Sequence, residues 1–386
     1  MICCDYQVPH LELLQRVFAL LESALVVNRA TEARLLGLQI LRAVAALLVV
    51  VDHSILNLIE KAGLSPELTP WASALGNIGV QIFFAISGFI MAYTTRNLFG
   101  AGQSLNFLLR RVFRIVPIYW LVTSIYVIRL WLGGDHFSVE EFVTSYLFIP
   151  FLDEEGKFRP LYGVGWTLNY EMLFYLVFAV CLALPRRIGI FLIFLTLSSL
   201  VAAGFVVKFD PVIFPVLAFY TNPIVLCFLG GVVAYFLSPY FYQLNFASAV
   251  SVLLAVGFVS IYSFAKGLIW LEPAVTLLAS SVAILVFSRM LFHKWEGRLL
   301  VLGTALGDAS FSIYLTHSFL LGPASSFWGW LDLPNDTTFV FVGAMLVGSS
   351  ALGWITYRAV EQPIMKALRP LLPDGRRRAV ATSDSR

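Results

Sequence analysis

The chain has 386 residues, of which 59% are hydrophobic and 13% are charged, and its formal net charge is only +3. Its mean hydropathy of +0.84 lies well outside the usual range of soluble domains. These values exclude a soluble globular enzyme. They predict a membrane protein that contacts lipid, and we expect no nucleic-acid partner.

Apolar runs close to the length that a helix needs to cross a membrane recur along almost the whole chain. We therefore expect an all-α, polytopic membrane protein, built as a bundle of about ten transmembrane helices. The expected spans cover residues 37–58, 74–95, 113–133, 164–184, 188–207, 212–237, 246–265, 268–289, 303–324 and 338–359.

The segments between these spans predict how the bundle is oriented. Cytoplasmic loops of membrane proteins carry an excess of Lys and Arg. Most of the 26 Lys and Arg residues fall in alternate segments, among them the loops near 96–114 and 289–298 and the C-terminal end. This asymmetry predicts that both termini are cytoplasmic.

Two terminal segments are expected to lie outside the bundle. Residues 1–36 are amphipathic and moderately charged, and they lack the long apolar core of a cleavable signal, so we expect a cytoplasmic amphipathic segment. Residues 366–386 are basic and polar, which predicts a cytoplasmic tail near anionic lipid. The transmembrane domain would then cover residues 37–365.

The first span contains two ionisable residues, Arg42 and His53, eleven positions apart in an otherwise apolar run. Eleven steps on a helix come to about 1100°, within about 20° of three full turns, so both side chains point the same way. They lie about 16 Å apart along the axis. Because charges are costly in lipid, such residues are functional candidates by default.

The next spans contribute small residues and a basic cluster. Gly79, Ser87 and Gly88 allow close helix packing, which is the simplest interpretation of the second span. Arg111 and Arg114 lie one turn apart at the cytoplasmic end of the third span. Such a cluster binds an anionic headgroup or a phosphorylated cofactor, or it acts only as a topology determinant.

Two later spans also carry polar side chains. Glu171 falls several residues inside a span, where a carboxylate either needs a cation or must be held protonated, and Arg42 and Arg129 are the candidate partners. An ion pair that only stabilises the bundle would explain Glu171 as well. His317 lies in the ninth span, and taken alone it is best explained as a packing or hydrogen-bonding residue.

Taken in order, these segments resemble the integral membrane acyltransferase 3 family of sugar O-acyltransferases, and most closely its exopolysaccharide-acetylating branch. The resemblance implies that His53 is catalytic and that Arg42 is its motif partner. It further implies donor binding by Arg111 and Arg114, and it places Glu171 at the acidic position of a tryptophan-led motif. It rests on the Arg42–His53 spacing and the runs GVQIFFAISGF, RRVFRIVP, WTLNYEMLFY, SFSIYLTH and EQP.

The family implies transfer of an acyl group, usually acetyl, from acyl-coenzyme A on the cytoplasmic side. The acceptor would be a hydroxyl of an extracytoplasmic polysaccharide or its lipid-linked precursor, at the inner membrane of a bacterium. Acyl-coenzyme A would be a donor substrate, with no tightly bound cofactor and no metal. This chain departs from the family at Gln81, where an acidic residue is usual, so an acid or base role there is in doubt.

The residues are suited to this chemistry. A neutral histidine can remove the proton of a sugar hydroxyl, and either Asp52 or Glu171 would set its tautomer. Direct transfer is simpler than an acyl-histidine relay, which stays open.

Two other functions are alternatives to acyl transfer: a glycan or lipid exporter without acyl transfer, and a scaffolding protein. The acyl chain, the acceptor glycan and the oligomeric state stay open, and the longest expected outer loop, 134–163, is the first place to look for a sugar site.

Overall fold

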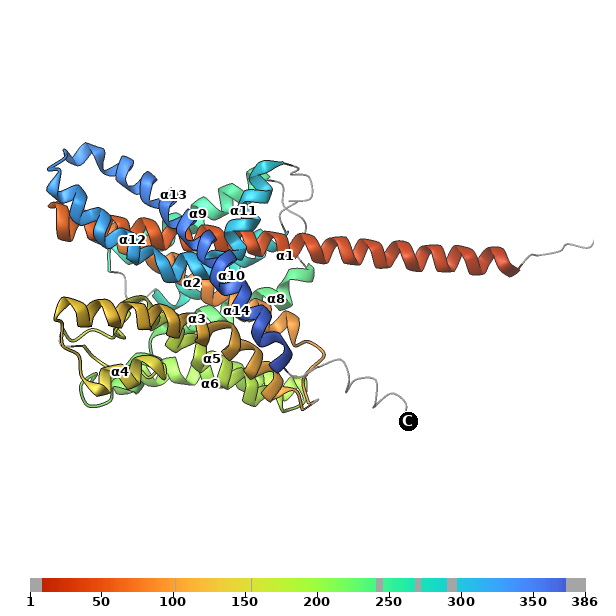
Figure 1. Cartoon of the computed structure of the whole chain (residues 1–386). Helices are drawn as coiled ribbons and strands as arrows, with labels where there is room; N and C mark the ends of the chain where they lie inside the picture. Colours follow the sequence, from red (N-terminus) through yellow and green to blue (C-terminus); the bar gives the residue numbers. More distant parts are fainter. Residues whose placement is uncertain are drawn as a thin grey trace, which may run out of the picture.

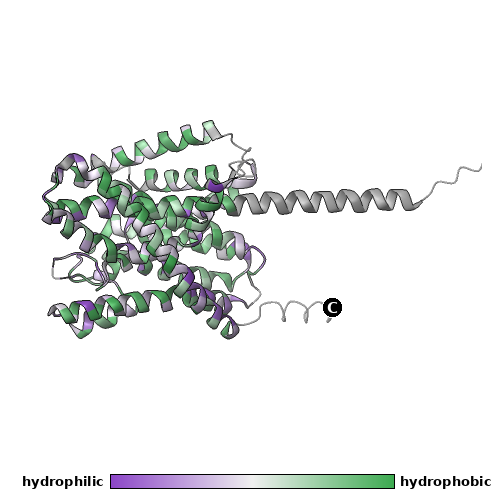
Figure 2. Cartoon of the chain, turned by 45° about the horizontal axis from the view of Figure 1, so that its top comes forward, coloured by the Kyte–Doolittle hydropathy of each residue, from purple (hydrophilic) through white to green (hydrophobic). Residues whose placement is uncertain are grey.

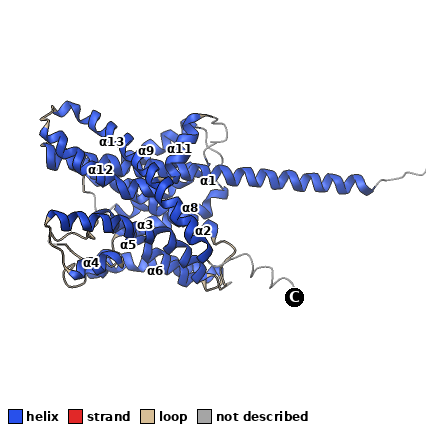
Figure 3. Ribbon diagram, in the orientation of Figure 1, coloured by secondary structure: helices blue, strands red, loops and turns tan. Residues whose placement is uncertain are grey.

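The computed structural model describes residues 9–372, apart from residues 101, 154, 241–245, 268–271 and 290–296, and it leaves out the side chains of residues 9–35. Within these ranges all regular structure is helical and no strand is present (Figure 3). The α-helices are α1 (Pro9–Ala62), α2 (Thr69–Thr94), α3 (Ser104–Gly133), α4 (Val139–Tyr146), α5 (Trp166–Leu182), α6 (Arg186–Val207), α7 (Pro215–Tyr220), α8 (Leu226–Leu237), α9 (Phe246–Ala265), α10 (Glu272–Arg289), α11 (Arg298–Asp308), α12 (Ser310–Trp330), α13 (Thr338–Thr356) and α14 (Gln362–Leu368).

Seven helical segments of the described chain are long and apolar enough to cross a membrane. The expected all-helical, multi-pass architecture is therefore confirmed, whereas the count of ten and the orientation stay predictions. Two shorter apolar helices, Ala247–Ser263 and Leu277–Ser288, fall within the seventh and eighth expected spans. The seven segments are Leu36–Ala62, Pro66–Thr94, Ser104–Gly133, Gly163–Leu182, Arg186–Val207, Pro223–Tyr240 and Thr338–Leu371.

Two expected spans are interrupted. The span expected at 212–237 consists of α7, a 3₁₀ turn at Pro223–Val225, and α8, because Pro223 has no backbone N–H to continue a helix. The span expected at 303–324 is divided at Ala309 into α11 and α12. Gly307 and Asp308, which precede the break, are poor helix formers.

The terminal segments are only partly described. The helix α1 joins the expected segment 1–36 to the first span without interruption, but the amphipathic character expected for that segment depends on side chains outside the described residues. At the other end, α14 and a 3₁₀ turn at Arg369–Leu371 cover the start of the expected tail 366–386. Residues 373–386 lie outside the described part.

The helices form two groups that meet along α2, α3 and α12. In Figure 1, α1, α12, α13, α9 and α11 lie above α3, α4, α5 and α6, and α14 crosses from the upper group toward the lower one. Hydrophobic residues cover most of the helix surfaces, and hydrophilic residues gather mainly at the two ends of the bundle (Figure 2). This distribution fits helices that run across a lipid layer.

Glycines bring the central helices close together. A Cβ at Gly79 would lie 2.6 Å from the backbone oxygen of Ala45 on α1, and one at Gly88 would overlap the backbone oxygen of Phe228 on α8. Gly231 of α8 lies in the same way against Ala85 of α2. The packing role expected for Gly79 and Gly88 is thus confirmed, and it holds α2 between α1 and α8.

Adding one methyl group at this contact should destabilise the bundle. We expect Gly231→Ala to lower the free energy of unfolding by about 1–3 kcal/mol, because the new Cβ overlaps the main chain of Ala85, which cannot rotate away. Thermal unfolding in detergent, followed by circular dichroism, measures the change. Gly257→Ala is the matched control, since no atom lies within 4 Å of the added Cβ. A loss of stability that is equal in both variants would contradict the packing argument.

Candidate active site

A partly open cavity lies between α1, α2, α3, α5 and α12, with about 750 Å³ of empty space that includes its opening to solvent. Much of its wall is aliphatic and aromatic, and includes Phe83, Phe84 and Phe311. Its polar wall brings together four residues that were predicted from the sequence, Arg42, Arg111, Arg114 and Glu171, together with Ser87 and Tyr175. Pockets of this kind, mostly apolar with a few convergent polar groups, are the usual form of small-molecule sites.

The three arginines of the cavity have no close carboxylate partner. Arg111 and Arg114 come from successive turns of α3, and Arg42 comes from α1, where its Nε donates a 3.1 Å hydrogen bond to Ser310 Oγ. None of the ion pairs within 4 Å in the described ranges includes any of these guanidinium groups. Their charges are therefore available to an anion that enters the cavity.

Glu171 faces the same cavity, but its partner differs from the one expected. Its Oε1 accepts a 2.7 Å hydrogen bond from Ser87 Oγ on α2. Neither candidate cation forms an ion pair with it within 4 Å in the described structure, and the guanidinium of Arg129 instead lies 5.6 Å from the ring centroid of Tyr126. Glu171 therefore forms no close ion pair with either candidate. It interacts with Arg42 only over a longer distance, and its close partner is a hydroxyl.

A second carboxylate, Glu361, lies near two of the arginines but does not line the cavity. A π-helical turn at Tyr357–Glu361 follows α13, and Glu361 is only 6% exposed, with its Oε2 accepting a 2.6 Å hydrogen bond from Ser312 Oγ. It is close enough to interact electrostatically with Arg42 and Arg114. Glu171 and Glu361 thus act on the three guanidinium groups electrostatically at longer range, without a direct ion pair. Since π-turns frequently occur at functional sites, this turn is a signal in favour of a functional role.

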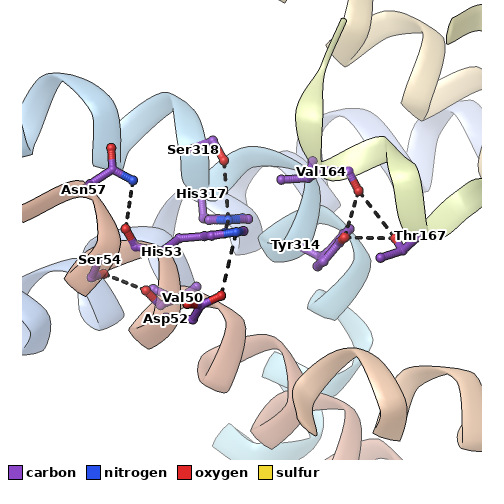
Figure 4. A network of polar contacts seen from close by, with 10 residues as sticks. All are labelled: Val50, Asp52, His53, Ser54, Asn57, Val164, Thr167, Tyr314, His317 and Ser318. Carbon is purple, nitrogen blue, oxygen red and sulfur yellow. Dashed lines mark hydrogen bonds and ion pairs between the residues drawn. The ribbon is translucent and has the colours of Figure 1, made fainter. Parts of the chain in front are cut away.

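His53 lies outside the cavity and forms a pair with His317 of α12 (Figure 4). The distance between His53 Nδ1 and His317 Nε2 is 2.7 Å, and the two ring planes are nearly parallel, with centroids 4.9 Å apart. On the other side of the ring, Asp52 Oδ2 lies 3.9 Å from His53 Nε2. His317 is fully buried, whereas the side chain of His53 is 32% exposed and can be reached by a substrate.

Arg42 and His53 both contact α12, which confirms that they share one face of α1. Arg42 reaches Ser310 and His53 reaches His317, so α1 and α12 run in the same direction along this contact. Tyr314 lies between these two points. It lines the cavity, and its ring centroid is 6.1 Å from that of His317, so one aromatic side chain connects the cavity to the histidine pair.

Hydrogen bonds hold Tyr314 in this position. Its hydroxyl donates to the backbone oxygen of Val164 at 2.8 Å and lies 2.8 Å from Thr167 Oγ1 (Figure 4). Val164 and Thr167 stand at the start of α5, where the run GVGWTLNYEMLFY begins. The turn before α5 therefore positions the residue that separates the arginines from the histidines.

The expected outer loop folds back toward the histidine pair. Tyr162, at its end, donates a hydrogen bond to the backbone oxygen of Leu315, and its ring stacks on Phe319, so both contacts flank His317 along α12.

The same loop carries a pair of opposite charges near a second hollow. Lys157 donates a 2.6 Å hydrogen bond to Glu155, which lowers the pKa of that carboxyl group. Beside the loop is a more open hollow of about 660 Å³, whose wall includes Arg159, Trp166, Tyr170 and Phe219.

Sequence reasoning located the arginines, Glu171 and His53, but it missed the roles of their neighbours. His317 and the EQP run were noted without a defined contact, and Ser310 was not singled out. Of the two carboxylates expected beside His53, Asp52 lies 3.9 Å from its ring, whereas Glu171 is bonded to Ser87. Gln81, where an acidic residue was expected, does not line the cavity. Within the described residues there is no group of three His, Cys, Asp or Glu side chains that could hold a metal ion.

The sequence of this chain is similar to one protein family and to three known proteins. A family model described as an acyltransferase domain matches residues 35–358. The exopolysaccharide production protein ExoZ of Rhizobium meliloti (strain 1021) is 33% identical over 308 residues, which cover 78% of this chain and 93% of ExoZ. The acyltransferase MdmB of Streptomyces mycarofaciens is 25% identical over 81% of this chain and 85% of its own length. A putative acetyltransferase, ORF330 of Acidianus two-tailed virus, is 24% identical over 63% of this chain and 72% of its own length. No solved structure matches the chain.

Proposed function

This chain belongs to the acyltransferase 3 family and is an acyltransferase, and on that premise we propose that it transfers an acyl group, with acetyl as the first candidate, from acyl-coenzyme A to a polysaccharide hydroxyl. The acceptor is an extracytoplasmic polysaccharide or its lipid-linked precursor. The similarity to ExoZ, which is named as an exopolysaccharide production protein, supports this class of acceptor. The observation that carries the proposal is a cavity with three arginines that have no close carboxylate partner, one aromatic side chain away from a histidine.

The donor binds in the arginine cavity. Coenzyme A carries several phosphate charges, and guanidinium groups bind phosphate through paired, charge-assisted hydrogen bonds. Arg111 and Arg114 are the first ligands, and Arg42, held by Ser310, lies next to them on the cavity wall. The aliphatic and aromatic remainder of the wall receives the pantetheine arm, which brings the thioester toward Tyr314.

His53 acts as the general base. Its neutral imidazole removes the proton of the acceptor hydroxyl, whose oxygen attacks the thioester carbonyl carbon to form a tetrahedral intermediate. The intermediate collapses with loss of the thiolate, and the imidazolium returns the proton to that sulfur, giving an O-acyl ester and free coenzyme A. The carboxylate of Asp52, 3.9 Å from His53 Nε2, stabilises the transient imidazolium electrostatically.

The membrane orientation follows from the same proposal. Ten spans with both termini in the cytoplasm put the start of α3, and with it Arg111 and Arg114, at the inner surface of a bacterial inner membrane. The donor then enters from the cytoplasm, and the acceptor approaches from the side of the loop that ends at Tyr162. Residues 37–365 form the transmembrane domain, between an amphipathic segment (1–36) and a basic tail (366–386).

Transfer by the purified full-length protein in proteoliposomes tests the proposal. Acetyl-coenzyme A labelled in the acetyl group is supplied on one side, with de-acetylated exopolysaccharide or its lipid-linked repeat unit as acceptor, and label in the glycan is measured. We expect label in the glycan and release of free coenzyme A in equal amounts. Succinyl-coenzyme A, run in parallel, identifies the acyl group.

Two results would overturn the proposal. Release of coenzyme A with no label in any glycan would mean that the acceptor is of another class. Movement of unmodified glycan across the vesicle membrane without acyl-coenzyme A would favour the exporter alternative.

A further inference from the structure

His53 and His317 form a single hydrogen-bonded unit whose buried member has no part in the mechanism above. The bond between His53 Nδ1 and His317 Nε2 is 2.7 Å long, and the ring planes differ by only 6°. His317 has no exposed surface, whereas His53 is partly exposed. Only His53 can therefore meet a substrate, and the question is what the buried partner does to it.

The contacts of His317 determine where its proton lies. Its Nδ1 is 3.3 Å from the backbone oxygen of Ile313, and a carbonyl oxygen can only accept a hydrogen bond. The Nδ1 atom must therefore carry the hydrogen, which leaves a lone pair on Nε2 of the neutral ring. The opposite assignment would place the lone pair of Nδ1 against the lone pairs of the Ile313 oxygen.

This assignment sets the tautomer of His53 in turn. Because His317 Nε2 accepts, His53 Nδ1 must donate, and the remaining nitrogen of His53, Nε2, carries the free lone pair. Ser318 Oγ also lies 3.4 Å from His317 Nε2, but a hydroxyl can donate or accept, so this contact does not decide the tautomer. Asp52 Oδ2 lies 3.9 Å from this free Nε2, too far for a hydrogen bond, so it does not set the tautomer of His53.

We propose that His317 is a positioning residue that holds His53 in the tautomer with hydrogen on Nδ1, so that Nε2 is the base for the acceptor hydroxyl. The inference rests on the proposed function, in which His53 takes that proton. The bond has a second effect. When Nε2 takes the proton, His53 becomes a cation, and its Nδ1–H bond to His317 becomes charge-assisted and stronger. His317 thus stabilises the charged state that the reaction passes through without taking the proton itself.

Two substitutions separate positioning from packing. His317→Gln puts an amide oxygen near the position of Nε2 and keeps an acceptor for His53, while His317→Phe keeps a ring in the same space and removes the acceptor. We expect His317→Phe to lower kcat about 100-fold or more. The upper bound is about 10⁴-fold, the loss seen when a catalytic histidine is held in the wrong tautomer. We expect the kcat of His317→Gln to stay within about tenfold of wild type. The KM values for donor and acceptor should change little in either variant.

A spectroscopic measurement tests the tautomer without relying on activity. The chain has five histidines, so ¹⁵N-histidine labelling of the full-length protein in lipid gives a small set of imidazole signals, and the signals lost in His53→Ala identify His53. Solid-state NMR of the wild type should show hydrogen on Nδ1 and none on Nε2. In His317→Phe, this protonation pattern should be lost or mixed.

The outcomes distinguish this inference from the proposed function. A wild-type His53 with hydrogen on Nε2, or an equal loss of kcat in the Gln and Phe variants, would overturn the positioning role. If the wild type transfers no acyl group to any glycan, the proposed function fails, and the NMR pattern still decides the tautomer. If His317→Phe does not fold, the wild-type spectrum and the kcat of His317→Gln carry the test.

Discussion

Replacing His53 with alanine is expected to lower acyl transfer by about 10²- to 10⁴-fold, which is the usual contribution of general acid–base catalysis. The protein should still reach the membrane at wild-type abundance, because the side chain of His53 is 32% exposed and its side-chain contacts in the described structure are with His317 and Asp52. The loss should appear in kcat. The KM for acyl-coenzyme A should change little, since His53 does not line the arginine cavity.

The measurement compares kcat in proteoliposomes and, in cells, O-acylation of surface polysaccharide by proton NMR of the purified glycan. A deletion strain complemented with each variant at equal membrane abundance provides the cellular comparison. His136→Ala is the matched control, because this histidine is exposed in the loop between α3 and α4 and contacts neither the cavity nor the histidine pair. If the His53→Ala variant restores the acyl signal as well as the control does, His53 is not the base and the mechanism is wrong.

Loss of either donor-site arginine is the second large effect that we expect. Arg111→Ala and Arg114→Ala should each raise the KM for acyl-coenzyme A by about 10- to 100-fold, because a hydrogen bond to a charged group contributes about 1.5–3 kcal/mol. Neither guanidinium is within 4 Å of a carboxylate in the described ranges, so its removal breaks no direct ion pair. The effect should therefore fall on donor binding and not on folding.

Initial rates at varied acyl-coenzyme A concentration, together with equilibrium binding of desulfo-coenzyme A, measure this change. Arg96→Ala is the control, since Arg96 is exposed and its guanidinium lies over the ring of Tyr93, 4.9 Å from the centroid, outside the cavity. An unchanged donor KM in both cavity variants would mean that the cluster only sets the topology of α3. A loss of the same size in Arg96→Ala would point to a general effect of basic charge at this surface.

Features that depend on neighbours along the chain were predictable. The apolar runs located the long helices, because the cost of exposing backbone groups to lipid makes each spanning segment helical regardless of its neighbours. Helical periodicity placed Arg42 and His53 on one face, and both indeed contact α12. Gly79 and Gly88 were recognised as packing positions for the same reason, since a missing side chain allows close approach to whichever helix is adjacent.

Features that depend on which helix is adjacent were not predictable. The hydrogen-bond partner of Glu171 is Ser87, 84 positions away in the sequence. Neither Arg42 nor Arg129 takes that place, because the packing of α2 against α5 puts a hydroxyl beside the carboxylate. The breaks before α8 and α12 also altered two expected spans, and only the second break lets Ser310 begin a new helix at the guanidinium of Arg42.

The sequence by itself determined that this is a helical membrane protein with the residues of an acyltransferase, since hydropathy, periodicity and motif order are local properties of the chain. Only the tertiary structure decided that three arginines share one cavity, that Glu361 lies near two of them, and that the partner of His53 is His317, 264 positions away. The physical reason is that a hydrogen bond is set by distance and direction between atoms. Those quantities depend on how α1, α3, α5 and α12 pack together, and no short segment of the sequence contains that information.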